Sequence, residues 1–272
     1  MDKPLIQILL STYNGSRFLR EQLDSIVNQS YRNWQLLIRD DGSSDGTEAI
    51  IEEYCTKHAN RIKFVSGGKG GDASSSFISM LHFVDSPYIM FCDQDDVWVT
   101  EKVQNAFNAI QSLEKQNPLA LHYTDMKIVN ENMTELYPSF FEQQKLNPEW
   151  SATPYHSFTQ SIAAGCTMIF TKALIHRLHP IKAPLFQHDH WLTMHASYYG
   201  VIGYSLEKTV YYRQHQSNVV GSHEINKSYF FSKISSLMEI WQRWKYIRTH
   251  FGNEISILKL IQSKWKLNKQ RV

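Results

Sequence analysis

Three carboxylates lie within four positions in the stretch Asp93-Gln94-Asp95-Asp96-Val97-Trp98, directly after the apolar run Tyr88–Cys92. Such a run predicts a short buried strand, and ligands of open α/β sheets gather at the carboxyl ends of strands. Neighbouring carboxylates repel one another, so we expect a cation here. Mg²⁺ and Mn²⁺ take oxygen ligands and leave positions for phosphates. The pattern therefore predicts a nucleotide diphosphate held through a metal, or, alternatively, a turn that caps the helix after Thr100.

Three earlier loops also place polar residues directly after apolar runs. They are Ser11–Gly15, Arg39–Thr47 and the glycine-rich Gly67–Asp72. In the second loop, Asp45 and Glu48 have the spacing of a helix N-terminal cap. In the third, Lys69 could face a phosphate. The third loop has neither a P-loop ending nor a dinucleotide fingerprint, so a plain flexible loop remains an alternative.

The alternation of apolar runs with helical periodicity sets the expected fold class. Strands are predicted at residues 5–10, 35–38, 62–65, 88–92 and 119–123, with amphipathic helices between them. This order predicts a doubly wound, mainly parallel α/β sheet of Rossmann-like type. Beyond it we expect a hairpin or long loop over 125–150, a strand ending near 170, a helix opening at 187–192 and a late strand at 210–215.

Composition separates a neutral-to-acidic body from a basic end. The 272 residues carry a net charge of +2, yet residues 227–271 hold ten Lys or Arg against two Glu, a balance of +8. No nucleic-acid partner is expected. The three cysteines are odd in number and widely spaced, which indicates reduced thiols rather than disulfides or a zinc site. Since neither a signal-peptide core nor an apolar run of about 18 residues is present, we expect a cytoplasmic protein.

The loop motifs, taken together, resemble those of family 2 glycosyltransferases with the GT-A fold. The resemblance rests on Thr12-Tyr13-Asn14, Asp40–Thr47 and Asp93–Trp98, and it extends over about residues 4–220. The longer forms Asp93–Trp98 and Tyr212-Arg213-Gln214-His215 are most similar to the bacterial rhamnosyltransferase branch of surface polysaccharide synthesis, which uses dTDP-L-rhamnose. We expect a catalytic domain at 1–221 and a helical appendage at 222–272.

The resemblance implies a role for each matching position. Thr12, Tyr13, Asn14 and Asp41 would contact the nucleotide, with Asp41 accepting from the pyrimidine N3–H. Asp93 and Asp95 would hold Mn²⁺ or Mg²⁺ and the diphosphate of a dTDP- or UDP-sugar, and His215 would complete the metal site. The remaining donor contacts would come from Lys69, Gly165 and Arg213.

The same resemblance identifies Asp189 as the general base of an inverting transfer. His188-Asp189 stands where the family has a Glu-Asp pair. A carboxylate on the acceptor side suffices to take the proton of the attacking hydroxyl. Asp189 as a helix cap, or His188 or His190 as the base, remain alternatives.

The basic end reads as an amphipathic helix. Phe230, Ile234, Leu237, Trp241 and Trp244 share one helical face, among basic residues. Such a helix can lie on an anionic membrane or pack on its own domain.

The best functional hypothesis is transfer of L-rhamnose to a glycan or lipid-linked acceptor in capsule or cell-wall synthesis. The alternatives are a UDP-hexose-dependent galactosyl- or glucosyltransferase, a sugar-phosphate nucleotidyltransferase and a non-catalytic glycan-binding module. The nucleotidyltransferase predicts a glycine-rich, basic signature near the N-terminus, where this chain has Ser11-Thr12-Tyr13-Asn14. The oligomeric state stays open.

Overall fold

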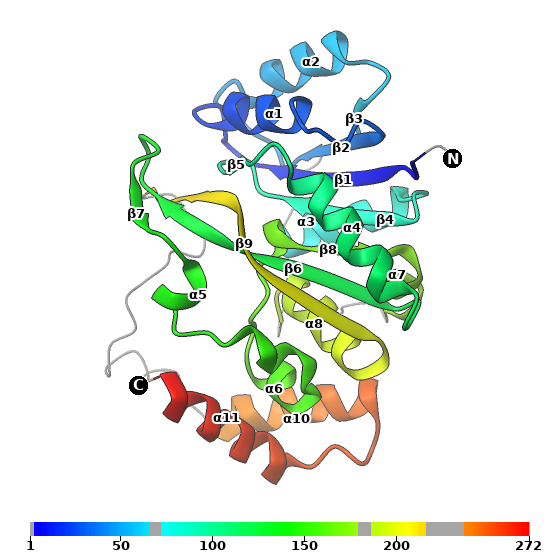
Figure 1. The fold of residues 1–272 in the computed structure, drawn as a ribbon, viewed down its shortest axis with the longest axis vertical. Coiled ribbons are helices and arrows are strands. Elements are labelled where there is room, and N and C mark those ends of the chain that lie inside the picture. Colours follow the sequence, from blue (N-terminus) through cyan, green and yellow to red (C-terminus); the bar gives the residue numbers. More distant parts are fainter. Residues whose placement is uncertain (1–2, 66–71, 179–185, 216–236, 272) are drawn as a thin grey trace.

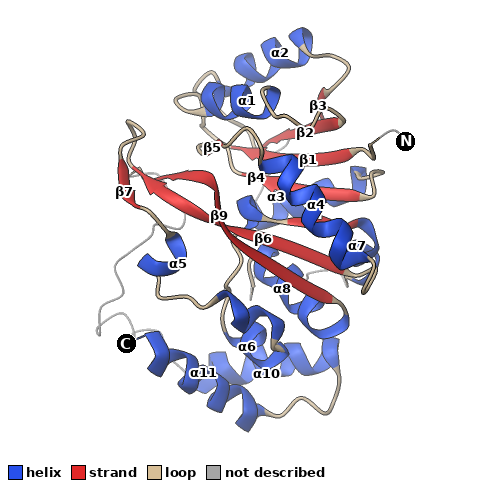
Figure 2. Cartoon of the chain, in the orientation of Figure 1, coloured by secondary structure: helices blue, strands red, loops and turns tan. Residues whose placement is uncertain are grey.

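A computed structural model describes residues 3–65, 72–178, 186–215 and 237–271. One mixed sheet runs through the molecule, with helices on both of its faces (Figures 1 and 2). Its strands are β1 (Ile6–Thr12), β2 (Trp34–Asp40), β3 (Ile62–Phe64), β4 (Tyr88–Cys92), β5 (Val97–Trp98), β6 (Ala120–Val129), β7 (Glu135–Tyr137), β8 (Ile169–Thr171) and β9 (Val201–Arg213). The helices are α1 (Leu19–Val27), α2 (Thr47–Lys57), α3 (Ala73–Met80), α4 (Lys102–Glu114), α5 (Phe140–Gln143), α6 (Pro154–Thr159), α7 (Lys172–Arg177), α8 (His188–Tyr199), α10 (Leu237–Phe251) and α11 (Ile257–Arg271).

The strand order is β3-β2-β1-β4-β8-β6-β9-β5, with β7 paired to β6. The four strands β3, β2, β1 and β4 are parallel, which confirms the predicted α/β class. The prediction is incomplete beyond β4, because β8 enters between β4 and β6 and runs antiparallel to both. Ile89 of β4 pairs with Phe170 of β8, 81 positions later, and Leu121 of β6 pairs with Phe170, 49 positions later. Local sequence patterns do not report such distant contacts.

Both faces of the sheet are buried, which explains the nearly continuous apolar runs. In β1, Ile8 and Leu10 pack into the cluster that includes residues of α1, α2 and α4. Leu9, with the opposite orientation, packs with Phe77 of α3 and Leu192 of α8. The carboxyl ends of β1, β2 and β4 therefore lie between a layer of helices on one face of the sheet and a layer on the other.

The segment from residue 125 onward, expected to be a hairpin or a long loop, begins as the last part of strand β6. Asp125 is 2% exposed within β6, and its carboxylate accepts hydrogen bonds from Ser139 Oγ, Phe140 N and Phe141 N. It therefore satisfies the first N–H groups of α5. The expected hairpin follows, formed by β6 and β7.

The cap predicted for α2 is displaced by one position. Gly46, with φ of 93°, is the capping residue, and Asp45 precedes it. Asp45 Oδ1 still accepts hydrogen bonds from Thr47 N (3.1 Å) and Thr47 Oγ1 (2.6 Å). These bonds lower the pKa of Asp45 to about 2, against the opposing effect of its burial.

The C-terminal helices pack on the body through a separate aromatic cluster. Ile247 and Phe251 of α10 contact Trp191 of α8 and Phe158 of α6 within this cluster. Trp244, expected on the apolar face, donates from Nε1 to the carbonyl of Ile255 at 2.8 Å. Phe230 and Ile234, and the boundary at 221/222, lie outside the described residues. Among the helices that the structure describes, none combines the length and apolarity that crossing a bilayer requires.

Candidate active site

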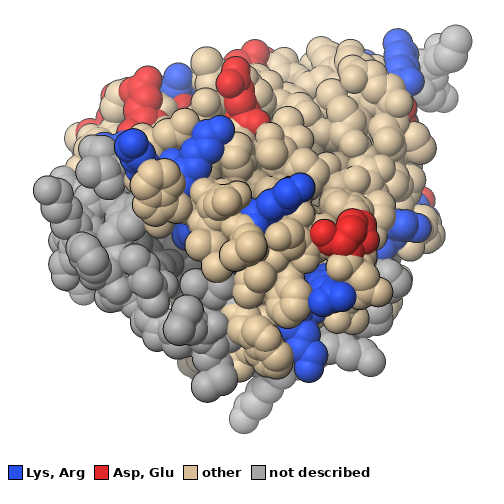
Figure 3. All heavy atoms as spheres, turned by 90° about the horizontal axis from the view of Figure 1, so that it is seen from below, with Lys and Arg blue, Asp and Glu red and all other residues tan. Residues whose placement is uncertain are grey.

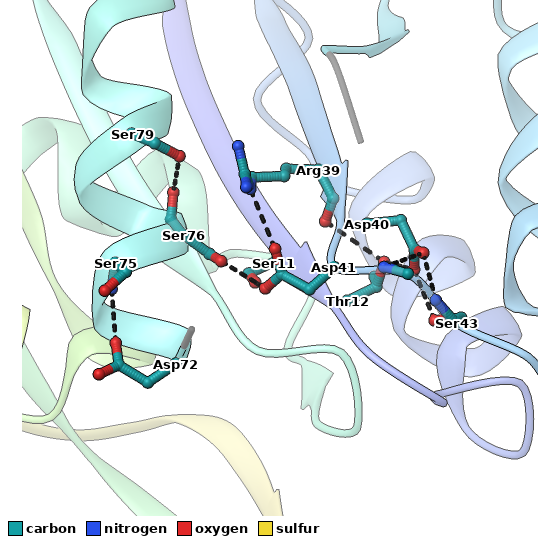
Figure 4. A network of polar contacts seen from close by, with 11 residues as sticks. Ser11, Thr12, Arg39, Asp40, Asp41, Ser43, Asp72, Ser75, Ser76 and Ser79 are labelled. Atoms are coloured by element: carbon teal, nitrogen blue, oxygen red, sulfur yellow. Dashed lines mark hydrogen bonds and ion pairs between the residues drawn. The ribbon is translucent and has the colours of Figure 1, made fainter. Parts of the chain in front are cut away.

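The carboxyl ends of β1 and β2 lie side by side and share one buried network (Figure 4). Thr12 Oγ1 donates to Asp40 Oδ1 at 2.7 Å. Asp40, which is fully buried, also accepts from Gly42 N (3.0 Å), Ser43 N (2.7 Å) and Ser43 Oγ (2.6 Å). Both Asp40 oxygens are therefore satisfied by the protein, and the loop after β2 is held in one shape.

Asp41 points to the other side of the same loop, toward α3 (Figure 4). Arg39 Nε donates to Asp41 Oδ1 at 3.0 Å, and the hydroxyls of Ser11 (3.3 Å) and Ser76 donate to Asp41 Oδ2. A carboxylate offers about four acceptor positions, so these contacts orient Asp41 and leave capacity for a further donor such as a ring N–H. Its side chain is 11% exposed. The prediction that Asp41 reads the base stays a prediction with compatible geometry.

A side-chain amide joins the first loop, Ser11–Gly15 at the end of β1, to the loop after β4 (Asp93–Asp96), which we call the acid loop. Gln94 Nε2 donates to the Tyr13 carbonyl at 3.0 Å, and the Tyr13 N–H donates to Gln94 Oε1 at 2.9 Å. The contact requires a glycine at 15, because a Cβ there would lie 2.2 Å from Gln94 Oε1. The Tyr13 ring itself is 59% exposed.

Asn14 links the first loop to the second. It adopts a positive φ of 47°, which asparagine tolerates better than most residues. Its side-chain Oδ1 accepts from Ser44 N at 2.9 Å, and its backbone N–H donates to Ser43 Oγ at 2.8 Å. Asn14 thus shapes the predicted nucleotide loops, while its predicted contact with the nucleotide itself stays untested.

The acid loop after β4 brings several carboxylates close together in a buried place. Ligand atoms of Asp93, Asp96 and Cys166 all lie within 4.8 Å of one another. Burial, followed by repulsion from Asp95 and Asp189, raises the pKa of Asp93 to about 7. Burial, followed by repulsion from Asp95 and Asp93, raises the pKa of Asp96 well above its ordinary value.

This cluster fits a hard divalent cation. Asp96 is fully buried, and its Oδ2 has no hydrogen-bond partner among the described residues. Such an oxygen, beside a second carboxylate, is what an ion with oxygen ligands would satisfy. The thiol of Cys166 is a softer ligand, and burial raises its pKa well above the ordinary value. The carboxylates are therefore the donors that suit Mg²⁺ or Mn²⁺.

The structure also brings Asp95 and His215 together, as the sequence motifs suggest. His215 Nε2 lies 2.8 Å from Asp95 Oδ2, and its ring packs 4.9 Å from that of Phe18. Arg213 lies behind the acid loop with its side chain 1% exposed. Its Nε donates to the Asp95 carbonyl (2.9 Å), and its backbone N–H to Asp96 Oδ1 (3.2 Å). Arg213 thus positions the acid loop, and direct contact with the donor stays a prediction.

Gly165 makes room for the start of α8. A Cβ at this position would lie 2.9 Å from His188 Nε2 and 3.6 Å from Asp189 Cβ. Asp189 stands in the first turn of α8, half-buried and near enough to Asp93 to raise the pKa of that carboxyl. The predicted base and the predicted metal ligand therefore face the same region.

The ring of His188 is fixed by neighbours on α3 and β4. It stacks on Phe77 at 4.4 Å and meets Phe91 edge-on at 4.9 Å between ring centroids. Ser74 Oγ lies 3.3 Å from His188 Nδ1 and accepts from His188 N at 3.2 Å. Burial lowers the pKa of His188. His190 turns away from the acid loop, with Nε2 2.6 Å from the carbonyl of Ser157, and burial lowers its pKa to about 4.

Comparison with known proteins decides the family. The sequence model described as "Glycosyl transferase family 2" matches residues 7–165, which include all three loops of the site. The chain belongs to glycosyl transferase family 2. The family assignment covers more than half of the chain and agrees with the position of the acid loop at the end of β4.

Two curated relatives place this family 2 chain among bacterial enzymes. It is 27% identical to "dTDP-rhamnosyl transferase RfbG" of Shigella flexneri, over 96% of this chain and 95% of the relative. It is 26% identical to "UDP-Glc:alpha-D-GlcNAc-diphosphoundecaprenol beta-1,3-glucosyltransferase WfgD" of Escherichia coli, over 71% and 69% of the two chains.

Solved structures confirm the GT-A-like fold. The S. aureus TarS fragment 1-349 in complex with UDP-GlcNAc superposes with a TM-score of 0.62 at 18% identity, over 97% of this chain and 72% of that one. The mannosyltransferase PcManGT from Pyrobaculum calidifontis, in complex with GDP-Man and Mn²⁺, gives 0.61 at 14% identity, over 99% and 74%.

Several residues of the family 2 site were not identified from sequence. Asp40, Asp96 and Ser76 make the contacts described above, and Lys102 lies buried beneath the acid loop. Lys102 Nζ donates to Thr209 Oγ1 at 3.3 Å, and burial lowers its pKa to about 8. The doubled acid Asp40-Asp41 was a signal, because Asp40 ends β2 and consecutive side chains of a strand point to opposite faces. Lys69 lies outside the described residues.

Proposed function

We propose that this family 2 enzyme is an inverting, metal-dependent glycosyltransferase that transfers L-rhamnose from dTDP-L-rhamnose to a glycan or lipid-linked acceptor in bacterial surface polysaccharide synthesis. The observation that carries the proposal is the placement of Asp189 across Gly165, near Asp93. Asp93 belongs to the carboxylates that would hold a metal and a diphosphate. Asp189, close to it, is a carboxylate that can accept a proton. Similarity to RfbG over nearly the whole chain supports the rhamnosyl donor.

Each residue of the site has a different role in the proposed reaction. Asp41 accepts the N3–H of the pyrimidine, held by Arg39 and Ser76. Asp93, Asp95 and His215 would hold Mn²⁺ or Mg²⁺, with the Asp96 oxygen that lacks a partner among the described residues beside them. The ion would supply positive charge to neutralise the leaving diphosphate. Asp189 takes the proton of the acceptor hydroxyl as its oxygen attacks the anomeric carbon from the face opposite the diphosphate. Gly165 lets His188 and Asp189 approach the backbone of this segment closely.

A second donor class has specific support. WfgD, named for a UDP-Glc donor, aligns over two thirds of this chain, and a ring imide N–H is common to uracil and thymine. Asp41 would accept either base. A UDP-hexose donor is therefore the alternative that the same site could use.

Donor binding and donor hydrolysis together test the proposal. We expect dTDP and UDP, with Mn²⁺, to raise the melting temperature more than GDP or ADP, because a purine presents a different edge to Asp41. Slow hydrolysis of dTDP-L-rhamnose would separate an enzyme from a binding module. The matched control is Asp41→Asn, which should remove the pyrimidine preference. Equal stabilisation by GDP would contradict the role of Asp41, and absence of hydrolysis and transfer with all donors would contradict the enzymatic proposal.

We place the enzyme in the cytoplasm, where nucleotide sugars are available, and at the membrane surface through its C-terminal helices. The helices α10 and α11 carry exposed basic and aromatic residues, which support this placement.

A further inference from the structure

Helix α11 has two apolar faces, and only one of them is used by the fold. Leu260, Ser263 and Leu267 are buried against the body. On the opposite side, Leu258 is 67% exposed, Ile261 44% and Trp265 68%. Their spacing of three and four residues places all three on one face of the helix. Scattered exposed apolar residues are ordinary, but three large ones aligned on one helix indicate an interaction surface.

The charged residues of α11 are all positive. Helix α11 contains four lysines and one arginine and neither Asp nor Glu. Lys259, Lys266 and Lys269 are exposed, and Lys269 Nζ lies 5.5 Å from the centre of the Trp265 ring. On α10, the exposed Trp241 has Lys245 Nζ 5.3 Å above its ring. Figure 3 shows Lys and Arg side chains spaced among other residues across this end of the molecule, together with some Asp or Glu side chains.

We propose that this surface docks onto an anionic lipid membrane, with α11 lying in the plane of the headgroups. We define the lipid-facing surface by Leu258, Ile261 and Trp265 with Lys259, Lys266 and Lys269. Apolar side chains of this kind enter the acyl boundary, while lysines extend along it to reach lipid phosphates. A second copy of the same surface would bring like charges together, so charge complementarity favours an anionic lipid over self-association.

The lipid-facing surface is firmly connected to the site through α6. Ser263 Oγ of α11 donates to the Tyr155 carbonyl of α6 at 3.0 Å. On the other side of α6, the Ser157 carbonyl lies 2.6 Å from His190 Nε2 of α8, the residue after Asp189. Docking would therefore fix the distance between the membrane and the proposed base. Such a geometry suits an acceptor attached to a lipid.

Vesicle binding of the full chain tests the surface. We expect co-sedimentation with vesicles of phosphatidylglycerol and phosphatidylethanolamine, lost at high salt, and little binding to pure phosphatidylcholine. Trp265→Gln should weaken the partition coefficient at least about tenfold, because a large apolar side chain no longer leaves water. Lys266→Gln combined with Lys269→Gln should weaken binding at low salt and reduce its salt dependence.

The matched control is Leu206→Gln, since Leu206 on β9 is 60% exposed outside this surface. It should bind vesicles as the wild type does. All variants should keep wild-type donor hydrolysis, so a failure of lipid binding is distinguishable from a failure of the proposed reaction. Equal vesicle binding by wild type and Trp265→Gln would overturn the proposal. So would a wild-type dimer in sedimentation analysis that Trp265→Gln converts to monomer, because the surface would then be a self-interface.

Discussion

Two groups of carboxylates lie at the same edge of the sheet, and they differ in how the protein treats them. Asp40, after β2, accepts four hydrogen bonds from its own loop and from Thr12. Asp96, after β4, is equally buried but keeps one oxygen without a partner among the described residues. The first carboxylate is part of the scaffold, whereas the second is arranged for something that the polypeptide does not supply.

The loop after β2 is rigid, whereas the acid loop after β4 holds unbalanced charge. The loops near Asp40 and Asp41 are complete without a ligand, so they can present a fixed edge to a nucleobase. The acid loop stores repulsion between Asp93, Asp95 and Asp96, which raises the pKa of Asp93 and Asp96. A bound cation would relieve that repulsion.

The largest effect is expected at Asp189, on the reactive side. Asp189→Asn keeps the shape and removes the proton acceptor, and it should lower turnover by about 10² to 10⁴, the usual size of a general-base contribution. The donor dissociation constant should change little, because the nucleotide loops are complete without Asp189. Transfer rate and calorimetric donor affinity, measured side by side, check this. Near-normal transfer would reduce Asp189 to a structural residue of the first turn of α8, where Gln187 is the capping residue, and direct attention to His188.

A pair of isosteric substitutions tests the contrast itself. Asp40→Asn places an NH₂ group against donors from Gly42 and Ser43, and it should lower the free energy of unfolding by about 2 to 3 kcal/mol. Asp96→Asn should leave the metal-free protein unchanged or slightly more stable. The raised pKa of Asp96 makes its neutral form the favoured one, and Asn imitates that form. Urea unfolding of both variants provides the measurement. Equal losses of unfolding free energy would show that Asp40 and Asp96 do not differ in this way.

The response to metal should depend on pH. Since the pKa of Asp93 is raised to about 7, its proton contributes stability that is fully present below about pH 4 and is lost as the pH rises through 7. Mn²⁺ must displace that proton. The rise in melting temperature caused by Mn²⁺ should therefore be small near pH 5 and larger at pH 8. Asp93→Asn should abolish this trend. The same shift at both pH values in the wild type would place the metal away from Asp93.

Sequence patterns predicted the parts of this contrast that depend on local order. Apolar runs followed by polar loops located β1, β2 and β4 and the three loops after them, and the helix that begins at His188 was expected where it lies. The insertion of β8 between β4 and β6 was not predictable in this way, because strand pairing between distant segments leaves no local signal. The different contacts of Asp40 and Asp41 were not predictable either, because they depend on the direction of each side chain.

The reason for glycine at positions 15 and 165 could not be predicted from the sequence either. Gly165 was expected to let the donor approach the backbone. In the structure the space beside it is bounded by His188 Nε2, at 2.9 Å from where a Cβ would be. Gly15 was part of a turn, and its need for a missing side chain comes from Gln94, which lies 79 positions later. Both requirements arise only when the loops assemble.

The smallest expected effect concerns the amide contact that joins the two regions. Gly15→Ala should displace Gln94 and break its pair of hydrogen bonds to Tyr13, because the new Cβ would lie 2.2 Å from Oε1. Losing these two bonds should cost about 1 to 2 kcal/mol in donor binding. Gln94→Ala should cost a similar amount by removing the amide itself. If the contact acts as a unit, the double variant Gly15→Ala/Gln94→Ala should bind donor no more weakly than Gln94→Ala alone, because the clash has been removed with the side chain. Calorimetry on the four proteins measures the coupling, and the expected non-additivity is about the full effect of one substitution. Strictly additive losses would show that Gly15 and Gln94 act separately, and that the nucleotide loop and the acid loop are positioned independently of each other.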